Sequence, residues 1–135
     1  MVHLWKVFCR SVLEQSCVLW DSGLSLENRE DLERTQKVFA KLVLEEDYKN
    51  YKNALDVLGI ETLDARRKLL SLRFAKTSIE DGILNDLFPK ISKNHQMKTR
   101  SRDLFKVNHA NTKRLKDSPV ITMQRMLNED NKEQT

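Results

Sequence analysis

The sequence predicts an all-α protein, with about five helices in a small irregular bundle. Apolar residues recur at three- and four-residue spacing over much of the chain, which is the period of a helix. Only 3 Gly and 2 Pro occur in 135 residues, too few for the turns of a many-stranded sandwich or barrel. The 39% of hydrophobic and 33% of charged residues are typical of a folded, helix-prone chain rather than a disordered one.

The first two helices are expected at 2–20 and 26–44. The first helix is predicted to have one broad buried stripe of apolar residues. Its members are Val2, Trp5, Phe8, Cys9, Val12, Leu13, Cys17 and Trp20. Asp21-Ser22-Gly23 should end this helix, with Gly23 in the left-handed conformation. Ser25 is the expected N-cap of the second helix. The inner face of that helix is assigned to Leu32, Gln36, Phe39, Leu42 and Val43.

A short helix at 50–58 and a longer one at 63–79 follow. Gly59 should end the former, and Thr62 should cap the latter. The longer helix also carries Arg66, Arg67, Lys68, Arg73 and Lys76. Such a basic face can contact a polyanion, but charged outer faces are more often simply solvated.

The apolar period weakens after Gly82. A turn at 85–89 should bring Leu87 and Phe88 onto the core. Residues 90–103 are polar and basic, so we expect them to be extended or mobile, and 104–107 could form a short edge strand. The wider stretch near 90–117 is therefore predicted to be basic and poorly ordered.

The last helix should begin at Ser118-Pro119, because Ser is a good N-cap and Pro suits the first helical position. Val120, Met123, Met126 and Leu127 give it an apolar stripe. We expect the helix to end near residue 128 and the chain to fray from Glu129.

Most of the positive charge lies in one short segment. Residues 89–116 contain nine Lys and Arg and one Asp, a net charge of +8, although the whole chain carries only +4. Concentrated charge of this kind attracts polyanions and neutralises phosphates. The predicted nucleic-acid contacts are Lys93, Lys98, Arg100, Arg102, Lys106, Lys113, Arg114 and Lys116. Phe105 is the only Phe, Tyr or Trp in this segment, which favours contact with the nucleic-acid backbone over base stacking.

The two cysteines, Cys9 and Cys17, are eight residues apart in one predicted helix, about 12 Å along its axis. That separation is too long for a disulfide, so we interpret them as reduced, buried, intracellular thiols rather than redox or metal groups. The N-terminal stretch is interrupted by Lys6 and Arg10 and resembles neither a signal peptide nor a membrane span. The chain is expected in the cytoplasm or the nucleus and not outside the cell.

Short sequence motifs along the whole chain, and the order in which they occur, resemble those of one protein family. They are Ser11–Lys37, the apolar and basic positions of Tyr51–Arg67, Leu72-x-Phe74-Ala75-Lys76, Thr99-Arg100-x-Arg102, Asn108–Ser118 and Met123–Asn128. Together they resemble the C-terminal thumb and tail of reverse transcriptases from non-LTR retrotransposons of the jockey-like kind. The resemblance implies a helical thumb-like region at 1–88, a basic irregular segment at 89–117, and a C-terminal helix with a frayed tail at 118–135.

As a transposable-element fragment, the chain would be the part of an RNA-directed DNA polymerase that follows the catalytic palm, truncated before it. The resemblance implies RNA or DNA as partner, together with the missing palm domain packed on the N-terminal helices. Neither a membrane nor a small-molecule substrate is expected. The alternative is a structural relic, an uncharacterised helical protein with no selected activity.

Catalytic residues of the family are not found in this sequence. Reverse transcriptases hold two divalent cations on carboxylates that include an Asp-Asp pair, and this sequence has no such pair. Glu45-Glu46-Asp47 is the nearest acidic cluster, and we interpret it as a solvated helix end. A phosphate loop, a nucleophile elbow and zinc spacing are also absent from the sequence. We therefore predict no enzyme activity, no cofactor and no metal site.

Overall fold

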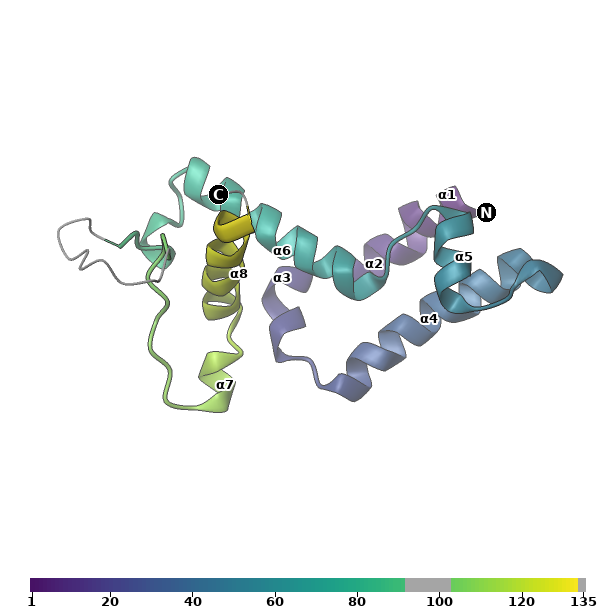
Figure 1. Cartoon of the computed structure of the whole chain (residues 1–135), viewed down its shortest axis with the longest axis horizontal. Coiled ribbons are helices and arrows are strands. Elements are labelled where there is room, and N and C mark those ends of the chain that lie inside the picture. The colour runs from purple at the N-terminus through teal and green to yellow at the C-terminus, as the bar shows by residue number, and fades with distance from the viewer. Residues whose placement is uncertain (92–102, 134–135) are drawn as a thin grey trace. The chain divides into compact units, whose positions relative to one another are not determined.

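A computed structural model describes residues 1–91 and 103–133 of the chain. These residues are predominantly helical and contain no strand, so the predicted all-α class is confirmed (Figure 1). The chain divides into two compact units. Unit 1 comprises Met1–Cys17 and Leu24–Leu69, and unit 2 comprises Val18–Gly23 and Leu70–Thr135. The functional division into thumb-like, basic and C-terminal parts stays a prediction.

Unit 1 begins with one continuous helical run of mixed type. Its parts are α1 (Val2–Leu4), a π-helical turn η1 (Trp5–Cys9) and α2 (Arg10–Glu14). The hydroxyl of Ser11 lies 2.6 Å from the carbonyl oxygen of Val7 and 2.9 Å from that of Phe8. Such bonds from Ser to preceding carbonyls compete with the regular ladder and accompany local distortion of a helix.

The predicted uninterrupted helix over 2–20 is wrong. The chain leaves the helix at Gln15, whose ψ is 122°, and Ser16 has a φ of 54°. A left-handed residue cannot continue a right-handed helix. Two short elements follow the break, α3 (Cys17–Trp20) and the 3₁₀ turn η2 (Asp21–Gly23). Gly23 is not among the residues of positive φ, so its predicted left-handed conformation is also wrong.

The predicted burial of the N-terminal stripe is wrong for much of its length. Trp5 and Cys17 are buried, and the Trp5 ring stacks on Phe39 with 4.3 Å between ring centroids. Phe8 and Val12, however, are 64% and 70% exposed. Neither cysteine forms a disulfide, but Cys9 is exposed and only Cys17 is buried, which corrects the prediction of two buried cysteines.

The helix α4 (Leu26–Leu44) begins as predicted, because the hydroxyl of Ser25 accepts a hydrogen bond of 3.2 Å from the N–H of Asn28. Gln36 is fully buried on its inner face, as expected, whereas Leu42 is 68% exposed and does not belong to that face. The helix ends at Glu45, which has a φ of 44° and opens the 3₁₀ turn η3 (Glu45–Asp47).

The next two helices match the sequence prediction closely. The first, α5 (Tyr51–Leu58), ends at Gly59, whose φ of 59° is the left-handed conformation that glycine adopts without strain. The second, α6 (Leu63–Glu80), starts with Thr62, whose hydroxyl accepts a 3.2 Å hydrogen bond from the N–H of Ala65. Residues from Leu70 onward in α6 belong to unit 2.

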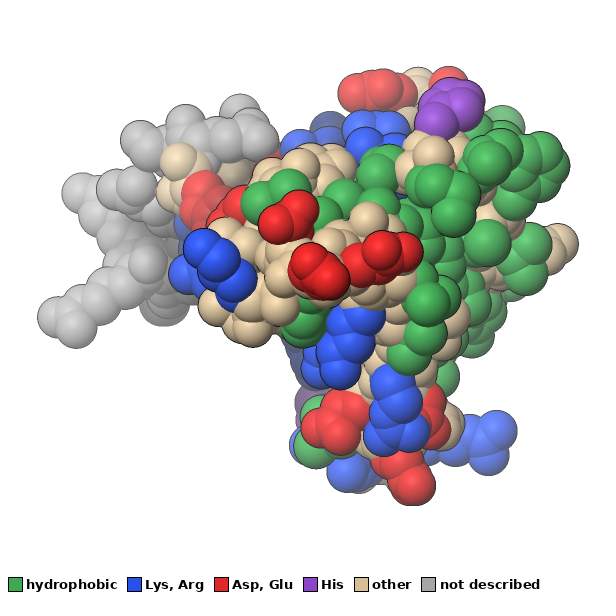
Figure 2. All heavy atoms as spheres, turned by 90° about the vertical axis from the view of Figure 1, so that its right-hand side faces the viewer, with side chains coloured by type: hydrophobic (Ala, Val, Ile, Leu, Met, Phe, Trp, Pro, Cys, Tyr) green, Lys and Arg blue, Asp and Glu red, His purple; other side chains and the backbone are tan. Residues whose placement is uncertain are grey.

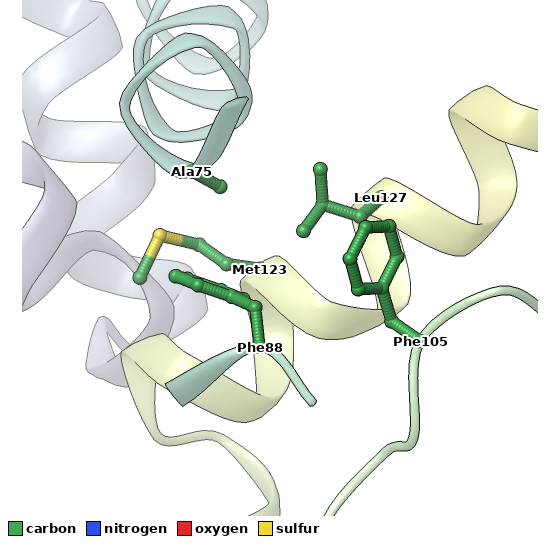
Figure 3. Close-up of a cluster of buried hydrophobic side chains, with 5 residues drawn as sticks. All are labelled: Ala75, Phe88, Phe105, Met123 and Leu127. Carbon is green, nitrogen blue, oxygen red and sulfur yellow. The ribbon is translucent and has the colours of Figure 1, made fainter. Parts of the chain in front are cut away.

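The core of unit 2 is a cluster of five buried apolar side chains that point toward one another (Figure 3). They are Ala75 of α6, Phe88, Phe105, and Met123 and Leu127 of α8. Val18, Leu72, Ile79 and Leu84 pack against this cluster. Phe88 follows the 3₁₀ turn η4 (Asn85–Leu87) and is buried as predicted, but Leu87 is 38% exposed, so its predicted burial is wrong.

The last helix, α8 (Pro119–Glu133), is longer than the sequence predicts. The expected fraying from Glu129 is wrong, because ion pairs of 2.8 Å join Lys76 to Asp130 and Lys132 to Asp103. The predicted edge strand is wrong as well: the described residues form a single antiparallel bridge between Lys90 and Phe105. A short helix, α7 (Lys113–Lys116), lies in the region predicted to be irregular.

Candidate nucleic-acid interface

Two buried amide side chains of α8 hold the extended segment that leads to the basic residues of unit 2. The Asn128 side chain accepts hydrogen bonds from the N–H groups of Leu104 and Phe105, at 3.0 and 2.9 Å. Its Nδ2 donates to the carbonyl of Phe105 at 2.9 Å. One asparagine therefore satisfies three main-chain groups, as a neighbouring strand would.

Gln124, one turn earlier on α8, repeats this arrangement. Its Oε1 accepts a 2.9 Å hydrogen bond from the N–H of Asn108, and its Nε2 donates to the carbonyl of Leu87 at 2.7 Å. Because Phe105 pairs with Asn128 and Asn108 with Gln124, the segment runs antiparallel to α8. This pairing fixes the backbone on both sides of Lys106.

Four of the eight predicted contact residues are described by the structure, and all four are exposed. Lys106 lies on the extended segment, where its N–H donates to the carbonyl of Pro89 at 2.8 Å. Lys113, Arg114 and Lys116 form the single turn of α7. The other four predicted contacts, Lys93, Lys98, Arg100 and Arg102, lie outside the described residues.

The turn of α7 is held by local bonds and by packing on α8. The hydroxyl of Thr112 caps it by accepting a 3.3 Å hydrogen bond from the N–H of Leu115. Arg125 of α8 donates from Nη1 to the carbonyl of Lys116 at 3.4 Å. The structure thus brings Arg125 beside the cations of α7. The sequence alone did not assign Arg125 to the site. Its only sequence signal is that it lies on the same predicted helix as the apolar stripe.

The four predicted contacts that the structure describes are not neutralised by acidic side chains. Within residues 1–91 and 103–133, none of them forms an ion pair. Two basic residues of α6 differ from them. Arg66 pairs with Glu14 at 3.3 Å and Lys68 with Asp64 at 2.7 Å. Unpaired cations on an exposed turn can neutralise phosphates without first breaking an internal ion pair.

Phe105 is not available to stack on a base. Its side chain is 7% exposed and belongs to the core cluster of unit 2. The surface around α7 can therefore make charge contacts and main-chain or side-chain hydrogen bonds to phosphates, which position a nucleic acid without reading its sequence.

A second candidate site is an open groove of about 750 Å³ in unit 1. It is lined by Leu26, Arg29, Glu30, Glu33, Lys37, Tyr51, Thr62, Asp64 and Lys68. The carboxylate of Asp64 lies 2.7 Å from both Arg29 Nη1 and Lys68 Nζ. The Tyr51 hydroxyl donates to Glu33, whose carboxylate also accepts from the N–H of Leu63 at 3.1 Å. These charges satisfy one another and tie α4, α5 and α6 together, so we assign the groove a structural role.

Two pKa values in this groove follow from that network. Burial, followed by the hydrogen bond to Glu33, raises the pKa of Tyr51 well above its usual value, so the phenol remains a proton donor. At Asp64, burial acts to raise the pKa, but the hydrogen bonds and charges of Lys68 and Arg29 outweigh it and lower the pKa.

Asp64→Asn should destabilise unit 1 by about 1 kcal/mol at neutral pH, since partly exposed ion pairs contribute little each. Because the folded pKa of Asp64 lies below its ordinary value of 3.8, the wild-type carboxylate stabilises the fold above that value and loses this effect as the pH falls through the folded pKa. The stability difference between the two proteins should therefore shrink on acidification. Urea unfolding from neutral pH into the acid range measures this, with the exposed Asp56→Asn as control; a difference that grows on acidification would contradict it.

Other kinds of site are not found in the described residues. Within residues 1–91 and 103–133, no three His, Cys, Asp or Glu side chains gather where they could hold a metal ion. None of the helices in that part of the chain has the length and apolarity needed to cross a bilayer.

Comparison with known proteins gives no match: no protein-family model, no curated protein and no solved structure is found to be similar to this chain.

Proposed function

We propose that this chain is a helical module that binds the backbone of a nucleic acid through the basic residues of unit 2. The observation that carries the proposal is the exposed, unneutralised group of Lys106, Lys113, Arg114 and Lys116. The resemblance of the sequence to the C-terminal region of a retrotransposon reverse transcriptase supports the same class of ligand. In this proposal the module holds a strand that a separate palm domain copies, and it does not catalyse nucleotide addition itself.

The charge distribution favours a polyanion over a small anion. The basic group extends from Lys106 along the extended segment to Lys116, and the segment 89–116 as a whole carries a net charge of +8. A single phosphate would engage only a small part of this group, whereas a nucleic-acid backbone presents phosphates in series.

The triple variant Lys113→Ala, Arg114→Ala, Lys116→Ala should bind a labelled RNA–DNA hybrid roughly 10- to 100-fold more weakly than the wild type near 0.1 M salt. Each lost phosphate contact should also reduce the log–log salt slope by about 0.9. Fluorescence anisotropy across a salt series measures both quantities, and circular dichroism checks that the helices remain.

A matched control removes three other exposed cations, Lys49, Lys52 and Arg73, which lie outside the basic segment. This control variant has the same net charge as the test variant. If the two variants lose affinity equally, binding follows overall charge and the assignment of α7 is wrong.

The alternative reading is a structural relic with no selected activity. Under that reading the wild-type chain should show no salt-dependent binding even at low salt, because no surface has been kept for a polyanion. We also propose that, in a longer polymerase, a palm domain packs on the N-terminal helices.

A further inference from the structure

The N-terminal helical run of unit 1 leaves an apolar stripe in solvent. Leu4, Phe8 and Val12 are 55%, 64% and 70% exposed, and Met1 and Val7 extend the stripe on either side. The side chains follow four-residue spacing through the π-helical turn η1. Since a π turn contains more residues than an α turn, this spacing keeps Leu4 and Phe8 close to one line along the helix.

Unit 1 buries few large apolar side chains of its own. Its buried hydrophobic residues are Trp5, Cys17, Ala40, Ala54, Ile60 and Leu63, and half of these are Ala or Cys. Figure 2 faces the end of unit 1 where α1 and α5 lie in Figure 1, and it shows a broad area of apolar side chains there. Val38, Leu42 and Val57 of unit 1 are also more than half exposed. Monomeric soluble proteins rarely expose a contiguous apolar patch beyond a few hundred Å², and larger patches mark interaction surfaces.

We propose that two copies of this chain associate through the stripe formed by Met1, Leu4, Val7, Phe8 and Val12. At their exposed fractions, the five side chains offer on the order of 500 Å². Two copies packed on one another would then bury on the order of 1,000 Å², the lower limit for a specific interface. The expected product is a weak dimer with a dissociation constant in the micromolar range.

The charges beside the stripe permit contact between identical surfaces. Lys6 donates from Nζ to the carbonyl of Gly59 at 3.1 Å, and Arg10 pairs with Glu14 at 3.4 Å. Both side chains are therefore engaged within unit 1, so neither brings an unpaired side-chain cation to the contact between two stripes. A twofold dimer needs a surface that is complementary to itself, and a single apolar helix face meets that need.

Sedimentation velocity tests the proposal on the full chain after nuclease treatment. Protein concentrations from about 1 to 200 µM bracket the expected dissociation constant. The wild type should pass from monomer to dimer, with association that rising salt does not weaken, unlike binding of a nucleic acid. Phe8→Glu should weaken association at least tenfold with an unchanged helical spectrum. If that variant loses helix, Val12→Glu replaces it. Ile83→Glu is the matched control, because Ile83 is 81% exposed but lies in unit 2. This variant should dimerise as the wild type does.

A wild-type chain that stays monomeric across the range would overturn the proposal and leave the stripe to another occupant, such as a separate domain. Dimers that persist in both Phe8→Glu and Val12→Glu would overturn it too, because the interface would then lie elsewhere.

Discussion

Asn128→Ala should destabilise unit 2 by about 3 to 5 kcal/mol, because it leaves three main-chain groups without their partner. Phe105 is buried and exchanges both of its main-chain hydrogen bonds with Asn128, so water cannot readily replace the lost amide. The N–H of Leu104 loses its bond as well. Typical domains are stable by only about 5 to 15 kcal/mol, so this single change should remove a large part of the total.

Urea unfolding followed by circular dichroism measures this loss as a fall in the transition midpoint at constant slope. Glu129→Ala is the matched control, since Glu129 is the next residue of α8 and is exposed; its effect should stay within about 0.5 kcal/mol. Equal midpoints for Asn128→Ala and the wild type would show that the extended segment is not held by α8.

Phe88→Ala should destabilise the protein by about 3 to 5 kcal/mol, because it opens a cavity in the cluster of buried apolar side chains that forms the core of unit 2. Phe88 is 3% exposed and packs with residues from α6, α8 and the extended segment. The ring therefore connects elements that are distant in sequence, and its removal affects all of them.

Phe74→Ala is the matched control for that change. Phe74 belongs to the α6 part of unit 2 but is 40% exposed, so the same truncation removes less buried surface and should cost clearly less. Thermal or urea unfolding compares the two variants. Equal destabilisation would mean that the two rings contribute equally, which the burial of Phe88 argues against.

The sequence predicted the helices whose ends are defined by local chemistry. Ser25, Gly59 and Thr62 act at the positions expected of them, because capping depends on residues only a few positions away. The N-terminal helix failed for the opposite reason. Its apolar period continues through Ser16, but periodicity carries no information on backbone conformation and did not reveal the left-handed residue that breaks the helix.

The candidate site was predicted by charge but not by position. Counting Lys and Arg located the basic segment, since composition needs no fold. Gln124 and Asn128 were missed, because the apolar period assigned only Val120, Met123, Met126 and Leu127 to the inner face of their helix, whereas here both amides are buried. Their partners lie 16 to 37 residues away in the chain, a distance over which local patterns predict no pairing.

The assignment of Val18–Gly23 to unit 2 has a consequence for how the polypeptide acquires its structure during synthesis. Val18 packs on a core whose other members follow Leu70, so this hexapeptide leaves the ribosome before any of its partners exist. At a translation rate of roughly 5 to 20 residues per second, several seconds pass between the synthesis of Val18–Gly23 and that of Leu70, because Leu24–Leu69 is made in between. Unit 1 can therefore begin to fold during translation, but unit 2 cannot be completed until α8 has emerged.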